Sequence, residues 1–234
     1  MNNLNKIIKK LLLNAIPINC PYDTVQKEFN QFIDLVSENF YLFSDKQLEL
    51  VDRKICKYKL NPKTFSLGLA IKINISRRFI KNELPDLPIS LNVINPVYRE
   101  RNRMSPQGKD NPFGENSILE KIKIFRKLEI LSSKKLSINF WVIDDVCPEK
   151  SGKFAEKIIK NNFPNQFRKK YHVLYLEDAV LKGLYPNKNA NNGSIKGASI
   201  HYALKTILES GLERSKESLF FDTDADLSIH PELL

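Results

Sequence analysis

From residue 89 onward, short apolar runs of strand length alternate with longer segments of helical periodicity. The strand-like runs span residues 89–94, 138–143, 173–176 and 219–221. Between them, apolar side chains recur every three or four residues within 118–128, 154–159 and 200–208. Strands that alternate with helices of this length form right-handed βαβ units around a parallel sheet. We therefore predict that residues 88–234 form an α/β domain with a Rossmann-like, mostly parallel sheet and flanking helices.

Residues 1–87 have a different pattern, which predicts a mainly helical N-terminal region. Apolar side chains between residues 25 and 40 fall on one helical face, and Asp23 with Gln26 resembles a helix-capping pair. Ser44 and Gln47 form a second such pair ahead of the next apolar run. Residues 65–75 alternate strictly between apolar and other side chains, which favours a strand and leaves a helix open. We expect this region to pack on the second domain or to mediate association.

Polar and acidic side chains follow each predicted strand. The first strand leads into residues 95–101, the second into Asp144 and Asp145, and the third into residues 177–178. The fourth leads into Asp222-Thr223-Asp224-Ala225-Asp226. Ligands of open parallel sheets bind outside the carboxyl ends of the strands, where these clusters should meet. Isolated acids after strands are also common as helix caps, and a solvated acidic loop is the alternative for the last cluster.

Three carboxylates at alternating positions repel one another unless a cation lies among them. A hard divalent ion, bound by carboxylate oxygens and by a polyphosphate, would satisfy that arrangement. Ahead of the last predicted helix, residues 192–198 contain Gly193, Ser194, Lys196 and Gly197. Free backbone N–H groups and one lysine at a helix start could contact a diphosphate, although a flexible loop is an equal alternative. The spacing is not that of a P-loop, and no strand leads into G-x-G-x-x-G, which argues against a nicotinamide dinucleotide site.

Four ordered motifs resemble those of the family 2 group of GT-A glycosyltransferases. They are N-P-V-Y-R-E-R at 95–101, V-I-D-D-V-C-P-E-K-S-G at 142–152, G-S-I-K-G-A at 193–198 and F-F-D-T-D-A-D-L-S-I-H-P-E at 220–232. The resemblance covers roughly residues 89–234. The resemblance implies a GT-A fold that binds a UDP- or GDP-sugar with Mn²⁺ or Mg²⁺. It also implies transfer of the sugar to an unknown acceptor, with inversion at the anomeric carbon.

The resemblance assigns roles to individual residues. Those implied to bind the nucleotide sugar are Pro96, Tyr98, Glu100, Asp144, Asp145, Lys196 and Asp224. Asp224 and Asp226 match the D-x-D motif that holds the metal ion in this family. Two departures concern the nucleoside contacts: Val146 stands where the family has glycine, and residues 104–114 lengthen the first loop.

In members of this family, the half of the chain that follows the D-x-D motif supplies the acceptor site and the catalytic base. Only eight residues follow Asp226, so we expect the catalytic base to lie beyond Leu234. This leaves a non-catalytic nucleotide-sugar-binding module, or a truncated or partner-dependent one, as the main alternative. A sugar-nucleotide nucleotidyltransferase is a weaker alternative, because residues 103–109 resemble that family's basic loop without its glycine-rich segment.

The net charge of +10 would suit a polyanionic partner, but the lysines and arginines are scattered through every segment. We therefore expect a solvated basic surface and no specific nucleic-acid partner. Three separated cysteines fit a reducing compartment, and no apolar stretch is long enough for a membrane span. The sequence thus favours a cytoplasmic location. Residues 1–87 could still contact a protein partner or, as a peripheral amphipathic segment, a membrane surface.

Overall fold

The computed structural model describes residues 2–18, 27–58, 61–84, 86, 88–185, 196–211, 217–227 and 231. The chain divides into two compact units. The first unit comprises Met1–Leu84 with Leu227–Leu234, and the second comprises Pro85–Asp226. No helix in the described part of the chain is long and apolar enough to cross a membrane.

The first unit is helical, as predicted. Its helices are α1 (Asn2–Asn14), α2 (Lys27–Asn39), α3 (Asp45–Ile55) and α4 (Pro62–Asn82). Helix α4 packs against the other three, and their apolar faces share one core that includes Phe32, Val51 and Leu67. Inside this core, Nδ2 of Asn74 donates hydrogen bonds to the backbone carbonyls of Ile33 and Ala70. A buried amide therefore ties α4 to α2 and has acceptors for its N–H groups.

The expected strand at residues 65–75 is wrong, because these residues lie inside α4. The helix begins at an Asn61 cap, whose side chain accepts from the N–H groups of Lys63 and Thr64, and Pro62 occupies the first turn. Both residues are helix-start signals. Leu67, Ile71 and Asn74 are buried at helical spacing, whereas Phe65 is half exposed.

The start of α3 matches the prediction made from Ser44 and Gln47. The Ser44 side chain accepts from the Gln47 N–H, and the Gln47 side chain accepts from the Ser44 N–H. This reciprocal capping box confirms the sequence signal. The second expected pair, Asp23 with Gln26, lies outside the described residues.

The second unit contains the predicted α/β sheet. Its strands are β1 (Ile89–Val97), β2 (Leu136–Asp144), β3 (Tyr171–Tyr175) and β4 (Glu217–Asp222). They form one all-parallel sheet in the order β3-β2-β1-β4. The fold class predicted from the alternating strands and helices is therefore confirmed. The third strand begins two residues earlier than expected, at Tyr171, and ends one residue earlier, at Tyr175, because Leu176 already begins the next helix.

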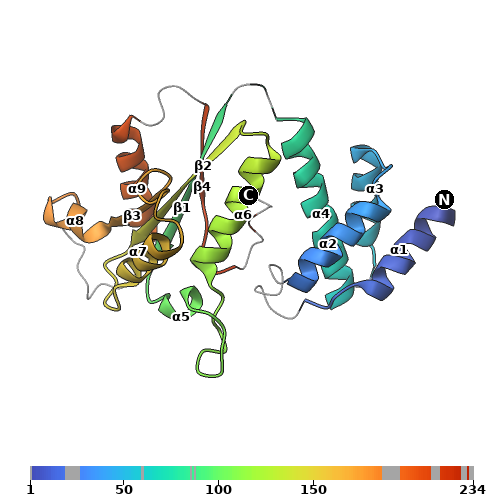
Figure 1. Ribbon diagram of the computed structural model, residues 1–234, viewed down its shortest axis with the longest axis horizontal. Helices are drawn as coiled ribbons and strands as arrows, with labels where there is room; N and C mark the ends of the chain where they lie inside the picture. The colour runs from blue at the N-terminus through green and yellow to red at the C-terminus, as the bar shows by residue number, and fades with distance from the viewer. Residues whose placement is uncertain are drawn as a thin grey trace. The chain divides into compact units, whose positions relative to one another are not determined.

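Helices cover both faces of the sheet (Figure 1). One face carries α6 (Ser117–Leu131) and α7 (Ser151–Asn162), where the rings of Phe125 and Phe140 meet edge to face at 5.4 Å. The other face carries α8 (Leu176–Leu181) and α9 (Lys196–Ser210), where Ile207 packs in one cluster with Ile94 and Trp141. The short helix α5 (Arg101–Met104) follows β1 directly.

The strand order reverses next to β1. From β1 the chain reaches β2 and β3 through α6 and α7, and it then returns through α8 and α9 to β4 on the opposite side of β1. Because the connecting helices lie on opposite faces, the carboxyl ends of β1 and β4 flank a topological switch point. This is the place where open α/β sheets bind their ligands.

Candidate functional site

A pocket of about 370 Å³ opens at the switch point, where β1 and β4 end. Its lining residues are Pro96, Val97, Tyr98, Glu100, Arg103, Lys196, Asp224, Ala225 and Asp226. The pocket thus brings together most of the residues singled out in the sequence, from three segments that are far apart along the chain. Asp144 and Asp145 are not among the lining residues.

The D-x-D segment continues the pairing of β4 for one residue beyond the strand. The N–H of Thr223 donates to the backbone carbonyl of Ile94 at 2.9 Å. Thr223 and Ala225 are buried, whereas the Asp224 side chain is 62% exposed and the Asp226 side chain 22%. Thr223 and Ala225 are thus turned into the protein, and the carboxylates of Asp224 and Asp226 line the pocket.

Each of these two carboxylates is ion-paired with a basic side chain. Nζ of Lys196, the first residue of α9, lies 2.9 Å from Asp224 and 3.0 Å from Asp222. The hydrogen bond to Asp224 is the main cause of the raised pKa of Lys196. On the other side of the pocket, Nη1 of Arg103 lies 2.8 Å from Asp226.

Arg103 joins three carboxylates. Besides the contact with Asp226, its Nε lies 3.2 Å from Glu100 and its Nη1 lies 3.4 Å from Glu115. Burial raises the pKa of Glu100, and the Arg103 guanidinium partly opposes that shift. Nothing in the sequence assigned Arg103 to this site or singled out Glu115. In the sequence, the intervening loop stood out only as an insertion at residues 104–114 and for the weaker nucleotidyltransferase resemblance of residues 103–109.

A buried lysine supports the D-x-D segment from the sheet side. Nζ of Lys121, on α6, donates hydrogen bonds to Oδ1 of Asn95 and to the backbone carbonyl of Asp224. Burial lowers the pKa of Lys121 to about 7, although the carboxylates of Asp226 and Glu115 oppose the shift. The sequence carried one signal of this residue, since Lys121 shares the apolar helical face of Ile118 and Ile122.

Asp144 holds a turn rather than facing the pocket. Its carboxylate accepts from the backbone N–H of Cys147 at 2.7 Å and from that of Gly152, in the first turn of α7, at 2.6 Å. Burial raises the pKa of Asp144, and the two N–H donors oppose that shift. A Cβ on Gly152 would lie 2.6 Å from the Asp144 Cβ, so the close approach requires glycine at this position.

Asp145 is buried beside this turn, and its N–H donates to the backbone carbonyl of Val97. The next residue, Val146, has φ of +53°. This left-handed conformation suits glycine, which the resembling family has here, and it is uncommon for a β-branched residue. The turn therefore keeps a glycine-like backbone at Val146.

Carboxylates outnumber basic groups in and around this pocket. Its five carboxylates belong to Glu100, Glu115, Asp222, Asp224 and Asp226, and its three basic groups to Arg103, Lys121 and Lys196. Carboxylate oxygens are the ligands that Mg²⁺ and Mn²⁺ prefer. Within the described ranges, no three His, Cys, Asp or Glu side chains are grouped closely enough to hold an ion by themselves. Asp224 and Asp226 could therefore supply part of a metal shell that phosphate oxygens complete.

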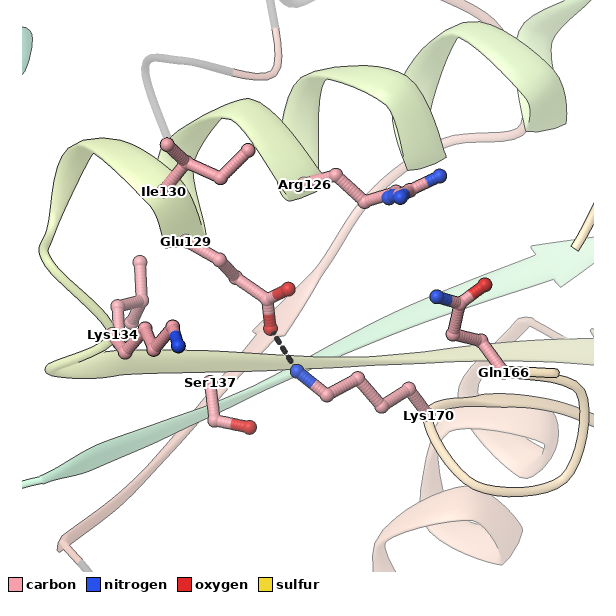
Figure 2. Close-up of a pocket in the computed structure, with 8 residues that line it drawn as sticks. Arg126, Glu129, Ile130, Lys134, Ser137, Gln166 and Lys170 are labelled. Atoms are coloured by element: carbon pink, nitrogen blue, oxygen red, sulfur yellow. Dashed lines mark hydrogen bonds and ion pairs between the residues drawn. The ribbon is translucent and has the colours of Figure 1, made fainter.

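A second pocket, of about 400 Å³, lies at the opposite end of the sheet, around the first residues of β2 (Figure 2). Its charged lining residues are Arg126, Glu129, Lys134 and Lys170. The Glu129 carboxylate pairs with Lys170 and accepts from the backbone N–H of Ile138 at 2.7 Å. With one carboxylate, already engaged, this pocket does not suit a divalent cation.

Comparisons of the chain with protein-family models, with curated proteins and with solved structures gave no match. The likeness to glycosyltransferases therefore rests on the four sequence motifs alone. Three of those motifs contribute residues to the switch-point pocket. The remaining motif, at residues 142–152, contains Asp144 and lies at the adjacent turn.

Proposed function

We propose that the second unit binds a nucleotide-diphosphate sugar, UDP- or GDP-linked, in the switch-point pocket and transfers the sugar to an acceptor with Mn²⁺ or Mg²⁺. One observation carries the proposal: the D-x-D carboxylates of Asp224 and Asp226 face the end of β1 across one pocket. An acidic pair at the switch point of a parallel sheet is suited to a metal-bound diphosphate.

The lining residues divide into two groups. Pro96 near the end of β1, with Tyr98 and Glu100 just after the strand, forms the side suited to a nucleoside, with a ring for stacking and a carboxylate for ribose hydroxyls. Lys196, Asp224 and Asp226 form the side suited to a diphosphate. A divalent ion held by the two aspartates would neutralise negative charge on the departing diphosphate. The remaining side chains bind and orient the donor.

A nucleotide-sugar-binding protein without turnover is the second candidate, and one observation favours it. Each of the pocket's carboxylates is engaged by a basic side chain: Glu100 and Asp226 by Arg103, and Asp224 by Lys196. A base that deprotonates an acceptor hydroxyl must be able to reach it and accept its proton. The described part of the pocket contains three carboxylates, all held in ion pairs, so it favours binding more directly than catalysis.

Calorimetric titration of UDP, GDP and CDP, with and without Mn²⁺, tests the binding step. We expect one nucleotide to bind only with Mn²⁺ and binding to be lost in the double variant Asp224→Asn/Asp226→Asn. The matched control, Asp110→Asn/Asp178→Asn, removes two exposed carboxylates of the same unit outside the pocket and should bind as the wild type does. Absence of nucleotide binding under all conditions would refute the proposal.

A second measurement separates the two candidates. Release of the free nucleotide from the corresponding UDP- or GDP-sugars, followed over hours with Mn²⁺, reports transfer to water or to an added acceptor. Turnover that disappears in Asp224→Asn/Asp226→Asn supports the transferase. Metal-dependent binding without any nucleotide release supports the binding protein.

A further inference from the structure

The two basic partners of the D-x-D carboxylates come from different segments and face the same pocket. Arg103 lies on α5, directly after β1, and Lys196 begins α9, which leads into β4. One pairs with Asp226 at 2.8 Å and the other with Asp224 at 2.9 Å. The carboxylates suited to a metal ion thus already have cationic partners.

The backbone places Arg103 firmly. Its carbonyl accepts from the N–H of Glu115 at 3.0 Å, which closes the intervening loop, and the neighbouring Met104 side chain is buried. Within the same loop, Nδ2 of Asn111 donates to the carbonyls of Asn102 and Pro106. These hydrogen bonds within the lengthened loop therefore fix the backbone position of Arg103.

The guanidinium of Arg103 keeps hydrogen-bonding capacity for a ligand. Its contacts with described residues use Nε and Nη1, so Nη2 takes no part in them. The side chain is 42% exposed at the pocket. Once Nη1 is released from Asp226, the edge formed by Nη1 and Nη2 can bind a phosphate group through two parallel hydrogen bonds.

A divalent cation and these two basic side chains compete for the same oxygens. An ion that binds Asp224 and Asp226 repels the Lys196 ammonium and the Arg103 guanidinium from them. Once displaced, both cations still line the pocket in which a metal-bound diphosphate would lie. Arg103 and Lys196 can then pair with the negatively charged diphosphate in place of the two aspartates.

We propose that Arg103 is a diphosphate-binding residue and that Arg103 and Lys196 exchange partners: they neutralise Asp226 and Asp224 in the metal-free protein and bind the diphosphate once a divalent ion is held there. The inference rests on the proposed function and adds to it a residue and a coupling. Because metal and diphosphate each remove an obstacle to the other, the two bind cooperatively. The protein holds Mn²⁺ weakly by itself and tightly with a diphosphate.

Two affinities in each variant test the exchange, with pyrophosphate as a probe that needs no knowledge of the base. Mn²⁺ alone is titrated by calorimetry and by the electron paramagnetic resonance signal of free Mn²⁺, and the Mn²⁺–pyrophosphate complex is titrated separately. In Arg103→Gln we expect Mn²⁺ alone to bind about 5-fold more tightly, and Mn²⁺–pyrophosphate to bind about 10-fold more weakly, within the usual range of coupling between sites. Lys196→Gln should change both affinities in the same directions.

Two matched controls remove one positive charge without touching the D-x-D carboxylates. Arg101→Gln lies on the same short helix, where its guanidinium packs over the Phe154 ring, and Lys205→Gln lies on α9, beside Glu209. Both should leave the two affinities within about 2-fold of wild type, because exposed charges outside the pocket are strongly screened. Thermal unfolding checks that each variant is folded. If Arg103→Gln does not fold, Lys196→Gln still tests the exchange.

The outcomes separate this inference from the function on which it rests. Opposite changes in the two affinities support the exchange. Weaker Mn²⁺ binding in both variants, or no change in either affinity, overturns it, while metal-dependent binding of UDP, GDP or CDP by the wild type would leave the proposed function standing. A wild type that binds neither Mn²⁺–pyrophosphate nor any nucleotide overturns both.

Discussion

The ammonium nitrogen of Lys121 lies 2.7 Å from Oδ1 of Asn95 and also donates a hydrogen bond to the backbone carbonyl of Asp224. One buried side chain thereby connects α6, the central strand β1 and the D-x-D segment after β4. Lys121 is 1% exposed. Such a cation is costly to bury unless its hydrogen bonds are satisfied, so its contacts hold the D-x-D backbone in place.

Replacement of Lys121 by methionine should destabilise the protein. Methionine fills a similar volume, but it leaves the Asn95 amide and the Asp224 carbonyl without their donor. We expect the free energy of unfolding in urea to fall by about 1–3 kcal/mol, the usual cost of an unsatisfied buried polar group. Lys123→Met, on the same helix, removes only a surface ion pair with Glu120 and should cost less than about 1 kcal/mol. Stabilisation by Lys121→Met would show that burial of the ammonium outweighs its hydrogen bonds.

Asp144 provides a prediction that separates a structural role from the nucleotide contact implied by the resemblance. An asparagine has one acceptor oxygen, so one of the N–H groups of Cys147 and Gly152 would lose its partner. We expect Asp144→Asn to lower the free energy of unfolding by about 1–3 kcal/mol. The affinity for nucleotide should stay within about 2-fold of wild type, since Asp144 does not line the pocket.

The control for Asp144→Asn is Glu177→Gln, which removes an exposed carboxylate from the first turn of α8. That substitution should change the free energy of unfolding by less than about 1 kcal/mol. If Asp144→Asn left stability unchanged and abolished nucleotide binding, Asp144 would be a ligand residue, as the resemblance implies.

The fold of the second unit could be predicted because its two central strands, β1 and β2, are mostly buried. Buried parallel strands appear in the sequence as nearly continuous apolar runs, and helices that cover a sheet show a helical period. The same reasoning placed the polar residues after β1 and β4 at one edge, where Tyr98, Glu100 and Asp224 line one pocket.

The rest of the site depends on how loops fold, which no local pattern shows. Arg103 reaches Asp226 only because the loop from residue 104 to 114 closes on itself. Asp144 and Asp224 both come after a strand predicted from the sequence, and nothing in the sequence distinguishes a carboxylate that caps a turn from one that faces a pocket. The strand expected at residues 65–75 failed for another reason: alternation also occurs in a helix when apolar side chains such as Phe65 are exposed.

The Asn61 cap at the start of α4, which favours a helix over the alternating pattern, provides another prediction. Oδ1 of Asn61 accepts from the N–H groups of Lys63 and Thr64, at 2.9 and 3.0 Å. Asn61→Ala should lower the free energy of unfolding of the first unit by about 1 kcal/mol, the typical value of a helix N-cap. Asn14→Ala, at the exposed end of α1, is the control and should have a smaller effect in urea unfolding followed by circular dichroism. Equal effects would mean that the Asn61 cap adds no stability.

His172 makes a prediction about acid stability. Its ring stacks on Trp141 at 3.7 Å, and burial lowers its pKa from 6.5 to about 4. Below pH 6.5 the unfolded chain takes up a proton at this histidine, whereas the folded protein does not until the pH approaches 4. The neutral ring therefore contributes stability at pH 7 that is lost as the pH falls. From pH 7.5 to 5 this residue alone should lower the free energy of unfolding by about 2 kcal/mol.

His172→Phe keeps an aromatic ring against Trp141 but cannot take up a proton. We expect the free energy of unfolding of this variant to fall less steeply than that of the wild type between pH 7.5 and 5, by about 2 kcal/mol over the interval. His201→Phe removes an exposed histidine on α9, whose ring hydrogen-bonds to Tyr185, and it controls for the loss of an imidazole. Urea unfolding at several pH values, with Trp141 fluorescence as the signal, gives the slopes. If His172→Phe retained the slope of the wild type, the acid sensitivity would have to arise from other groups, and the ring of His172 would not be held neutral by its burial.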